Sequence, residues 1–384
     1  MRSVQIQGRV VVVAGLLAWL SPRQGRAEDS VAYKYEDYAE SGGRISVQAQ
    51  YGRVEKDLGP DLHFKLQGVI DAIAGATPNG EPPATPGGPV PLTELHDRRK
   101  AWSTELSRQF PRVNVTLGYA NSRESDYVSD AWSVNTLTDF NQKNTTLLAG
   151  VAVTNDDVRV LYLFKDQKKR SLDLIAGVTQ LLGPSTSVTC NLGYGRSTGF
   201  LGDPYRLIQK RTEVFPGLFL PVDYGESRPH ERDKWTVQAS VNHAVAAVHG
   251  AVEAGYRYYQ DSFGSRAHTV EAAWFQQCGE HLVLSPSVRF YEQDAADFYL
   301  ISLNGQGFTP AFKPNPAGPY YSSDYRLSAL RSLTLGLKAV WTFNASWQFD
   351  AAIEKYEMRG TDGMTSQSAY PRATMKTVGL KFTW

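Results

Sequence analysis

The charged side chains best placed to act together lie on three predicted strands between residues 249 and 289. His249, Glu253 and Arg257 are spaced by four residues, so in a strand all three would share one face. If the two following strands continue that face, Glu271 and Arg289 join them. Such a ladder could form a charged constriction that filters solutes by the sign of their charge. The alternative, which we favour, is a structural network of salt bridges on the same face.

The residues needed for an active site or a metal centre do not cluster in the sequence. The histidines are scattered, with no recurrent spacing beside serine or aspartate that would bring a nucleophile, a base and an orienting group together. No spacing typical of a zinc site occurs either. Cys190 and Cys278 are predicted to lie on strands too far apart for a disulfide. We therefore expect no catalytic residue, no metal and no cofactor.

Composition narrows the class of protein. The chain has 384 residues, with 40 Lys and Arg against 39 Asp and Glu, so it lacks the positive charge that neutralises nucleic-acid phosphates. It is rich in tyrosine (20) and glycine (33), and aromatic residues favour strands. We expect an all-β protein with no nucleic-acid partner. Composition alone leaves two possibilities, a large soluble β fold and a closed membrane barrel.

A period of two in hydrophobicity runs through the chain and predicts strands with one apolar and one wet face. In 234–242, for example, Trp235, Val237 and Ala239 alternate with polar residues. Several apolar faces end in an aromatic residue: Tyr51, Trp102, Tyr119, Tyr194, Trp235, Tyr256, Tyr258, Trp274, Phe290, Trp341 and Trp347. Aromatic ends of this kind are typical of the girdles on the outer wall of bacterial outer-membrane barrels. They favour such a barrel over a soluble sandwich.

Short and long connections alternate between the predicted strands. The segment 109–112 is a short connection, whereas 199–232 and 295–324 are long ones. Short periplasmic turns and long external loops are typical of an up-and-down barrel. We predict a closed antiparallel transmembrane barrel of about sixteen strands (roughly fourteen to eighteen), with the N- and C-termini periplasmic. The proline-rich loop 74–98 is expected to contain neither helix nor strand.

The N-terminus has the three-part layout of a secretory signal peptide. A basic start precedes an apolar run over 10–20, and Gly25 and Ala27 supply the small residues of a cleavage site. The apolar run is too short to span a bilayer, which takes about 20 helical residues. We therefore expect residues 1–27 to be cleaved on export. Residues 28–384 would then form a single barrel domain in the cell outer membrane.

The end of the chain carries a pattern that predicts an assembly signal. Val378, Leu380, Phe382 and Trp384 occupy every second position up to the C-terminus. The pattern resembles the C-terminal strand that the barrel-assembly machinery recognises in bacterial outer-membrane proteins, although Phe is the usual last residue. This strand must close the sheet against the first one, because lipid does not accommodate an open sheet edge. We therefore expect the assembly machinery and outer-membrane lipid to be partners of the chain.

Three further stretches resemble one bacterial family. Residues 69–78 close the third predicted strand, 177–180 lie in a later strand, and 199–206 open the largest loop. The loop motif consists of Gly202, Asp203, Pro204 and Tyr205. Together the stretches are similar to DUF3570, a family of bacterial outer-membrane proteins defined as a domain of unknown function. The resemblance covers essentially the whole mature chain and implies an outer-membrane barrel, without an assigned chemistry. From the residues, we expect the loop motif to form a fixed turn rather than a catalytic site.

The sequence leaves three functions open. The first is a passive pore or transport channel for small solutes, because barrels of this predicted size typically enclose an aqueous lumen. The second is a structural or interaction barrel, plugged by its own loops, that works with periplasmic or surface partners. The third is an outer-membrane enzyme such as a hydrolase, which the scattered histidines disfavour. Nothing in the sequence identifies a solute.

Overall fold

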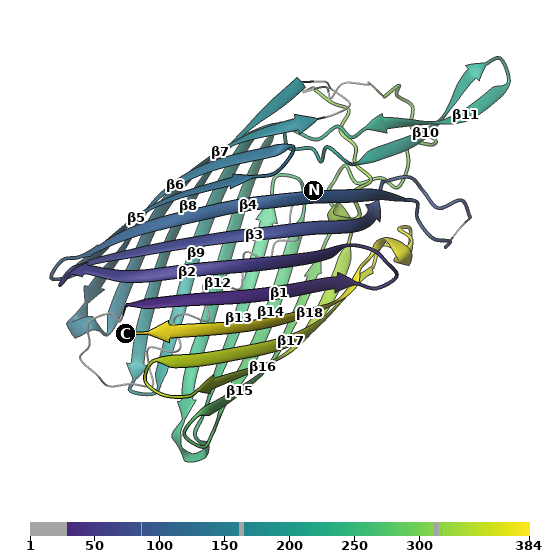
Figure 1. The fold of residues 1–384 in the computed structure, drawn as a ribbon. Helices are drawn as coiled ribbons and strands as arrows, with labels where there is room; N and C mark the ends of the chain where they lie inside the picture. The colour runs from purple at the N-terminus through teal and green to yellow at the C-terminus, as the bar shows by residue number, and fades with distance from the viewer. Residues whose placement is uncertain (1–28, 86, 161–164, 311–314, 316) are drawn as a thin grey trace.

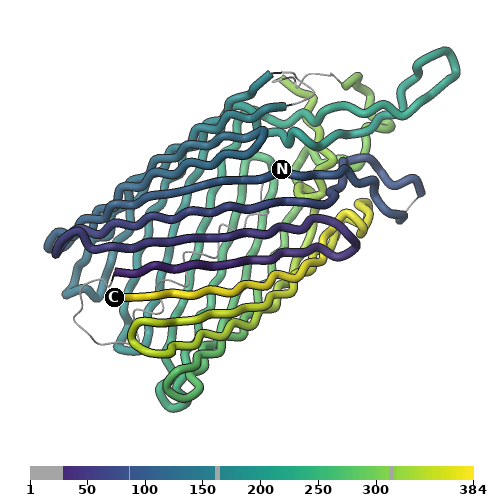
Figure 2. Tube along the Cα trace, viewed as in Figure 1, coloured from purple at the N-terminus to yellow at the C-terminus, as the bar shows by residue number. Residues whose placement is uncertain are grey.

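The computed structural model describes residues 29–85, 87–160, 165–310, 315 and 317–384, and the chain forms a closed antiparallel β-barrel (Figures 1 and 2). The sixteen barrel strands are β1 (Ser30–Glu40), β2 (Ser46–Gly59), β3 (Leu62–Pro78), β4 (Leu92–Gln109), β5 (Val113–Arg123), β6 (Tyr127–Phe140), β7 (Thr145–Val160), β8 (Lys165–Gly183), β9 (Thr186–Gly199), β12 (Glu231–Val245), β13 (Gly250–Asp261), β14 (Arg266–Cys278), β15 (Leu282–Gln293), β16 (Leu330–Thr342), β17 (Trp347–Gly360) and β18 (Arg372–Thr383). The predicted all-β class, the closed barrel and the number of strands are confirmed. The predicted signal segment lies outside the described residues.

The remaining elements are short and lie in the connections. Strands β10 (Leu207–Phe215) and β11 (Leu218–Gly225) pair with each other as a separate hairpin. Four 3₁₀ turns complete the set: η2 (Asn141–Lys143), η4 (Ala246–Val248), η5 (Tyr325–Leu327) and η6 (Gln367–Ala369). Among the described residues, no helix has the length and apolar character needed to cross a membrane.

Strand order follows chain order around the wall, and the first and last strands close it. Each strand pairs with the next, except that β9 pairs with β12 across the hairpin. At the closure, Ser30 lies opposite Thr383 and Glu40 lies opposite Ala373. The backbone N–H of Trp384 donates to the carbonyl of Asp29 at 3.0 Å, which extends the pairing by one step. No barrel strand therefore presents a free edge to lipid.

The two ends of the barrel differ in the length of their connections. At one end, called the turn end here, tight turns such as 110–112 join neighbouring strands, and Ser30 and Thr383 lie there. At the other, the loop end, the segments 200–230 and 294–329 leave the wall (Figure 1). Both described ends of the chain therefore lie at the turn end. Which side of the membrane this end faces stays a prediction.

The predicted loop 74–98 is wrong in its bounds. Strand β3 continues to Pro78 and β4 begins at Leu92, so that only 79–91 is irregular. The two strands extend past the apolar wall because each satisfies the backbone groups of the other, with Gly75 opposite Leu95. At Gly75 φ is +125°, and a Cβ there would lie 2.2 Å from the Arg44 carbonyl oxygen. Glycine permits this close approach of two backbones.

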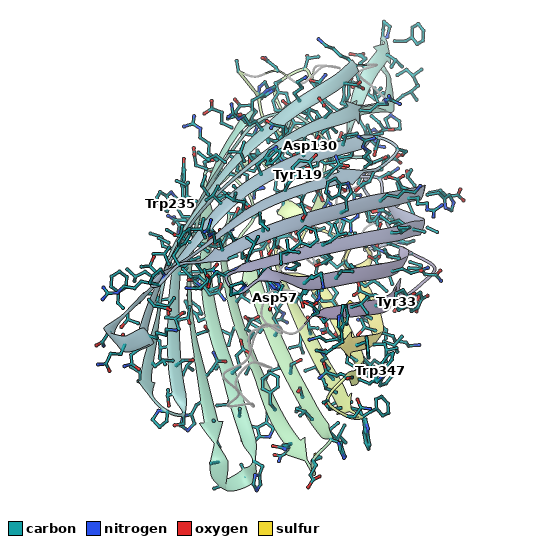
Figure 3. All side chains as sticks on the ribbon, turned by 60° about the vertical axis from the view of Figure 1, so that its left-hand side comes forward. Tyr33, Asp57, Tyr119, Asp130, Trp235 and Trp347 are labelled. Carbon is teal, nitrogen blue, oxygen red and sulfur yellow. The ribbon has the colours of Figure 1, made fainter. Side chains whose placement is uncertain are left out.

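The outer wall carries the aromatic residues predicted for a membrane barrel. Towards the loop end, the rings of Tyr119 and Trp132 lie 4.5 Å apart, and the Tyr119 hydroxyl donates to Asp130 at 2.6 Å (Figure 3). Towards the turn end, the rings of Trp347 and Phe382 lie 4.7 Å apart. Aliphatic residues exposed on the same face occupy the band between, including Val237, Leu335, Leu337, Ile353 and Leu380. An apolar band between two aromatic girdles is the outer surface of a membrane barrel.

Strand β2 reverses the expected assignment of faces. Tyr33 is half exposed on the outer wall, so its neighbour Lys34 points into the lumen. Tyr51 lies opposite Lys34 and therefore also points into the lumen, so its predicted place in the girdle is wrong. The polar Gln50 faces outward instead, where its side chain accepts a hydrogen bond from the Tyr33 hydroxyl at 3.3 Å. Alternation is present over 45–51, but the apolar side of this segment faces inward.

The assignment of faces predicts opposite outcomes for two arginine substitutions on β12. Val237→Arg places a charge on the lipid-facing wall, where Val237 is 45% exposed, and should destabilise the barrel by about 2–4 kcal/mol if this position lies near the bilayer midplane. Ser240→Arg places the same charge in the lumen and should be tolerated. Urea unfolding in lipid vesicles, followed by tryptophan fluorescence, measures both. Equal stability of the two variants would contradict the assignment of faces.

Candidate functional site

Four of the five predicted ladder residues share the lumen face of β13, β14 and β15. Glu271 lies opposite Arg289, and Arg289 Nε is 3.8 Å from Glu271 Oε2. Arg257 lies opposite Thr269, and among the described residues its buried Nε has no hydrogen-bond partner. Glu253 is on the same face of β13 because it is four residues from Arg257. The structure thus brings these four together along one side of the lumen.

His249 does not lie on that face. It follows η4 in the turn between β12 and β13, with φ of +50° and an exposed side chain. The strand predicted to include His249 therefore begins one residue after it, at Gly250. The turn closes through a bond from the His249 N–H to the carbonyl of Ala246 at 3.1 Å. His249 is a residue of the turn end, apart from the lumen charges.

Several other lumen-facing charges are paired with a charge of opposite sign. Arg99 Nη2 lies 2.6 Å from a carboxylate oxygen of Asp71, which is 3% exposed. Four wider pairs line the wall: Lys34–Glu36 at 3.7 Å, Lys65–Glu105 at 3.1 Å, Lys234–Asp173 at 3.8 Å and Lys338–Asp350 at 3.8 Å. Both signs of charge thus occur side by side, which favours a polar lumen without a strong field of one sign.

The loop end contains a network of six charged side chains, five of them buried, which we call the mouth network. Its members are Asp203, Arg206, Glu226 and Arg228 from segment 200–230, and Asp324 and Arg326 from segment 294–329. Three carboxylates face three guanidinium groups, so the network is neutral. It joins the two longest connections of the barrel to each other.

Asp324 is the centre of the mouth network. The side chain of Arg228 donates to Asp324 Oδ2 at 2.9 Å, and that of Arg326 donates to the same oxygen at 2.6 Å. Arg206 Nε is 4.0 Å from Asp324 Oδ1, and Arg206 Nη2 donates to Thr77 Oγ1 on β3 at 3.0 Å. Arg326 also donates to Asp203, across 123 positions of sequence. The network therefore fastens both loops to each other and to the wall.

Burial and pairing set the protonation of these carboxyls. Burial alone would raise the pKa of Asp324, but Arg326, Arg206 and Arg228 outweigh it and hold the pKa well below its usual range. Burial dominates at Glu226, whose pKa is raised even though Arg228 lies beside it. A carboxyl whose pKa is lowered in the folded protein stabilises the fold at pH values above its ordinary pKa. That stabilisation is lost as the pH falls through the pKa of the folded state. Asp324 therefore stays ionised at neutral and mildly acidic pH.

Most of the apolar core of the molecule also lies at the loop end. One cluster packs Phe263, Phe298 and Leu327, with the two phenyl rings 5.0 Å apart. A second packs Ile208 and Leu303, both fully buried, against aromatic residues of the loops. These clusters join segment 200–230 to segment 294–329. The long loops are thus ordered against one another over the mouth of the barrel.

The loop motif lies within this arrangement. Asp203 Oδ1 accepts a hydrogen bond from the backbone N–H of Tyr205 at 2.9 Å, while the Asp203 N–H donates to Glu226. The Tyr205 hydroxyl donates to Asp126 in the turn between β5 and β6. Gly202 and Pro204 flank Asp203 in this turn. The motif positions one carboxylate of the mouth network.

Sequence reasoning missed the rest of the mouth network. Arg206 was noted only as the end of the stretch 199–206. Glu226, Arg228, Asp324 and Arg326 were not singled out, because the loop containing each one gives no periodicity. The available signal was local, since an acid is followed by an arginine two or three residues later at three places in the long loops. That pattern marks candidate ion pairs but not which loops they join.

A second acidic group lies at the loop end. Carboxylate oxygens of Asp97, Glu124 and Asp126 lie within 4.8 Å of one another. Burial raises the pKa of Glu124 to about 7, and the negative charges of Asp97 and Asp126 add to the effect. At neutral pH this carboxyl is therefore near the midpoint of its titration.

Glu124 predicts a pH dependence of stability. The pKa of Glu124 in the folded protein lies above its ordinary value of 4.5. Its contribution to the stability of the fold is therefore fully present below pH 4.5 and is lost as the pH rises through about 7. Glu124→Gln should flatten the fall in melting temperature between pH 5 and pH 8. Melting curves at four pH values check this, with the exposed Glu94→Gln as control. An unchanged slope in Glu124→Gln would contradict the assignment.

The C-terminal assembly residues lie on β18 and just beyond it. Val378 and Leu380 are 44% and 43% exposed on the outer wall. Phe382 stacks against Trp384, with their rings 5.7 Å apart. The four residues therefore lie on the lipid-facing side of the strand that closes the barrel.

Comparison with solved structures places the fold among outer-membrane barrels. CdiB from Acinetobacter baumannii matches with a TM-score of 0.52 and 8% identity, over 93% of this chain and 61% of its own. A bacterial polysaccharide outer membrane secretin matches with a TM-score of 0.50 and 7% identity, over 93% and 98%. The siderophore receptor PirA from Pseudomonas aeruginosa has a TM-score of 0.45 and 11% identity, over 93% and 62%. The chain thus spans less than two thirds of that receptor.

At such low identity these matches show the fold alone. A search of curated protein sequences finds no match. The family model for "Protein of unknown function (DUF3570)" matches residues 18–163 and 162–383. This is nearly the whole length, and the stretches noted in the sequence lie within it. The chain therefore belongs to the DUF3570 family, as its sequence predicted, and is an outer-membrane-type β-barrel.

Proposed function

We propose that the chain is a passive channel for small solutes in the bacterial outer membrane, with its loop end outside and its mouth narrowed by segments 200–230 and 294–329. One observation carries the proposal: sixteen strands close around a lumen lined by charged side chains. Barrels of about 16–18 strands leave an aqueous channel, whereas about eight strands leave an interior that side chains fill. The proposal assigns no enzymatic activity and no cofactor.

The pairing of lumen charges supports weak rather than strong selectivity. Lumen pairs such as Arg99–Asp71 and Arg289–Glu271 place both signs together, so neither cations nor anions meet a ring of like charge. On β13, Glu253 and Arg257 take part in no ion pair among the described residues, but they carry opposite signs. We therefore expect almost no preference between cations and anions.

Planar-bilayer recording of the purified barrel tests the proposal. We expect discrete conductance steps and a reversal potential near zero in a salt gradient. Arg257→Gln should shift the reversal potential towards cation preference, and Glu253→Gln should shift it towards anion preference, without changing the step size much. Absence of conductance both in the natural chain and in the mouth variant Asp324→Asn would overturn the channel.

A second function is favoured by the order of the loops. The mouth network and the apolar clusters around Phe263 and Ile208 are what a barrel plugged by its own loops would contain. Such a barrel would act in contact with periplasmic or surface partners. Liposome swelling in small sugars separates the two functions, since a plugged barrel admits none of them.

Export and cleavage belong to the same proposal. Residues 1–27 would direct secretion and be removed, which leaves Glu28 as the first residue of the mature chain. N-terminal sequencing of protein recovered from outer membranes checks this directly. An intact Met1 in that fraction would contradict cleavage.

A further inference from the structure

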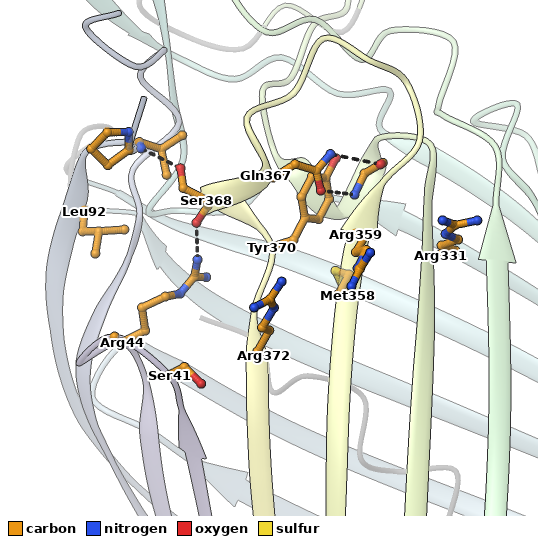
Figure 4. A pocket seen from close by; sticks show the side chains of 14 residues that line it. Ser41, Arg44, Leu92, Arg331, Met358, Arg359, Gln367, Ser368, Tyr370 and Arg372 are labelled. Carbon is orange, nitrogen blue, oxygen red and sulfur yellow. Dashed lines mark hydrogen bonds between the residues drawn. The ribbon is translucent and has the colours of Figure 1, made fainter. Parts of the chain in front are cut away.

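A pocket on the outer rim of the barrel is lined by arginines and by no carboxylate. It has a volume of about 640 Å³ and lies at the loop end over β16, β17 and β18 (Figure 4). Its four cations are Arg44, Arg331, Arg359 and Arg372. The β1–β2 turn, the segment 89–92, the end of β17 and the β17–β18 connection form the rest of its wall. A pocket of this composition fits an anion with several acceptor oxygens.

One of the four arginines serves the fold. Arg44 is 9% exposed and bonds Glu40 at 2.8 Å, and its Nη1 donates to the carbonyls of Ser368 and Ala369 at 2.8 and 3.0 Å (Figure 4). These bonds hold the β17–β18 connection against the β1–β2 turn. Arg44 is therefore part of the scaffold that shapes the pocket.

The other three arginines are exposed, and carboxylates neutralise only part of their positive charge. Arg359 and Arg372 share one carboxylate, Glu357, at 2.8 and 3.0 Å, and their side chains are 54% and 67% exposed. Arg331 is exposed and lies directly opposite Arg359 on the neighbouring strand. Two like charges directly opposite each other destabilise a strand pair unless an anion lies between them.

The position of these arginines on the wall suggests the kind of anion. On β16, β17 and β18 the outward residues are apolar up to Leu333, Ile353 and Val378. The next outward residues towards the loop end are Arg331, Lys355 and Lys376, and beyond these lie Arg359 and Arg372. The change from apolar to cationic occurs on three adjacent strands. It marks the boundary between acyl chains and headgroups in the leaflet at the loop end.

The acids on the same part of the wall do not cancel this charge. Five outward cations are accompanied by three outward acids. These are Glu357, Glu292, which lies opposite Arg331, and Asp37, which lies opposite Lys376. Some cations at the loop end elsewhere on the wall are paired one to one, as in Arg196–Glu231 at 2.7 Å and Lys168–Asp157 at 3.7 Å. Arg98, Lys100 and Arg123 on β4 and β5 form a second outward group that takes part in no ion pair among the described residues. The cations of β16–β18 differ from that group because they line a pocket.

We propose that Arg331, Arg359 and Arg372 bind the phosphate of a phosphorylated lipid headgroup in the leaflet at the loop end, with its acyl chains along the apolar wall of β16–β18. Guanidinium groups bind phosphate oxygens in bidentate fashion, and basic pockets at the membrane boundary recognise anionic headgroups. The inference rests on the proposed orientation in the outer membrane but not on the channel. A non-conducting barrel with a bound lipid would remove the channel and leave the lipid site.

Native mass spectrometry of the detergent-purified barrel tests the site. The probe is diphosphoryl lipid A, compared with its dephosphorylated form and with inorganic phosphate. We expect the natural chain to retain the diphosphoryl form at least tenfold better than the dephosphorylated form. Millimolar inorganic phosphate should not displace it, because a free anion gains nothing from the apolar wall.

Variants identify the residues. The triple variant Arg331→Gln, Arg359→Gln, Arg372→Gln should lose retention at least tenfold, whereas Glu357→Gln should increase it, because it releases two guanidinium groups. Arg159→Gln, Lys168→Gln and Arg196→Gln together form the matched control on the opposite wall and should change nothing. Heat-modifiable migration on gels establishes that each barrel is folded.

Three results would overturn the proposal. The first is equal retention by the triple variant and the natural chain. The second is equal retention of the phosphorylated and dephosphorylated lipids. The third is displacement by inorganic phosphate at the same concentration as lipid, which would make the pocket a site for a free anion.

Discussion

Replacing Asp324 with Asn should release the loops over the mouth and raise the conductance of the barrel several-fold. Asp324 is 2% exposed and receives hydrogen bonds from Arg228 and Arg326, with Arg206 4.0 Å away. The asparagine has nearly the same shape but no charge, so the guanidinium groups of Arg206, Arg228 and the partly exposed Arg326 would face two carboxylates. Removing one partner from a buried ion pair costs about 3–5 kcal/mol.

The loss should fall on the loops rather than on the wall. The barrel strands are held by continuous backbone pairing, whereas segments 200–230 and 294–329 are joined to each other through the mouth network and two apolar clusters. We therefore expect the variant to form a normal heat-modifiable barrel whose loops are cut faster by added protease. Single-channel recording should show larger or more frequent steps.

Asp166→Asn is the matched control for this change. Asp166 pairs with Arg159 at 3.4 Å, and both side chains are more than 60% exposed. Exposed ion pairs contribute only about 0–1 kcal/mol, so this variant should resemble the natural chain in both assays. Identical protease sensitivity of Asp324→Asn and Asp166→Asn would show that the mouth network does not hold the loops.

The wall of the barrel was predictable because its physics is local. A strand in contact with lipid on one side must alternate, and segments such as 234–242 show that period directly. The number of strands followed from counting turns. Bounds were less accurate where strands extend beyond the apolar wall, as β3 and β4 do, because pairing with a neighbour replaces the apolar signal there.

Which face of a strand meets lipid was less predictable. Alternation defines two faces, and in β2 the apolar one packs inside, where Ile45 joins a core with Tyr38 and Leu95 at the loop end. Nothing within the segment 45–51 distinguishes that core from a lipid-facing band. The lumen charges on β13–β15 were predictable because residues paired on neighbouring strands point to the same face of the sheet. His249 was assigned to the wrong place because a turn interrupts the period of two before β13.

The mouth network was beyond sequence reasoning because its contacts are distant in the chain. Arg326 meets Asp203 across 123 positions, and Arg206 meets Thr77 across 129. Each residue lies in a loop whose conformation depends on the other loop, so neither segment predicts the contact alone. The rim pocket was unpredictable for the same reason, because its arginines become neighbours only through the pairing of β16, β17 and β18.

Deleting Phe382, Thr383 and Trp384 should abolish assembly of the barrel in cells. Phe382 lies opposite Val31 on β1 and opposite Trp347 on β17, so the deletion removes the turn-end part of the closure on both sides of β18. The backbone of β1 at Ser30 and Val31 would lose its partners on β18, while it keeps those on β2. Unpaired backbone groups in lipid each cost several kcal/mol. The deletion also removes the aromatic end that we propose the assembly machinery recognises.

Two point variants separate recognition from closure. Phe382→Ala keeps the backbone pairing but removes the ring that packs on Trp347 and Trp384, whereas Lys381→Ala changes the neighbouring position on the opposite face of the same strand. We expect the amount of folded protein in outer membranes to fall at least several-fold for Phe382→Ala and to stay unchanged for Lys381→Ala. Refolding of the purified Phe382→Ala chain into lipid vesicles should still succeed, because closure does not depend on the ring. Equal outer-membrane yields of the two variants would show that the aromatic end is not the recognised feature, and refolding of the three-residue deletion to a stable barrel would show that closure does not need it.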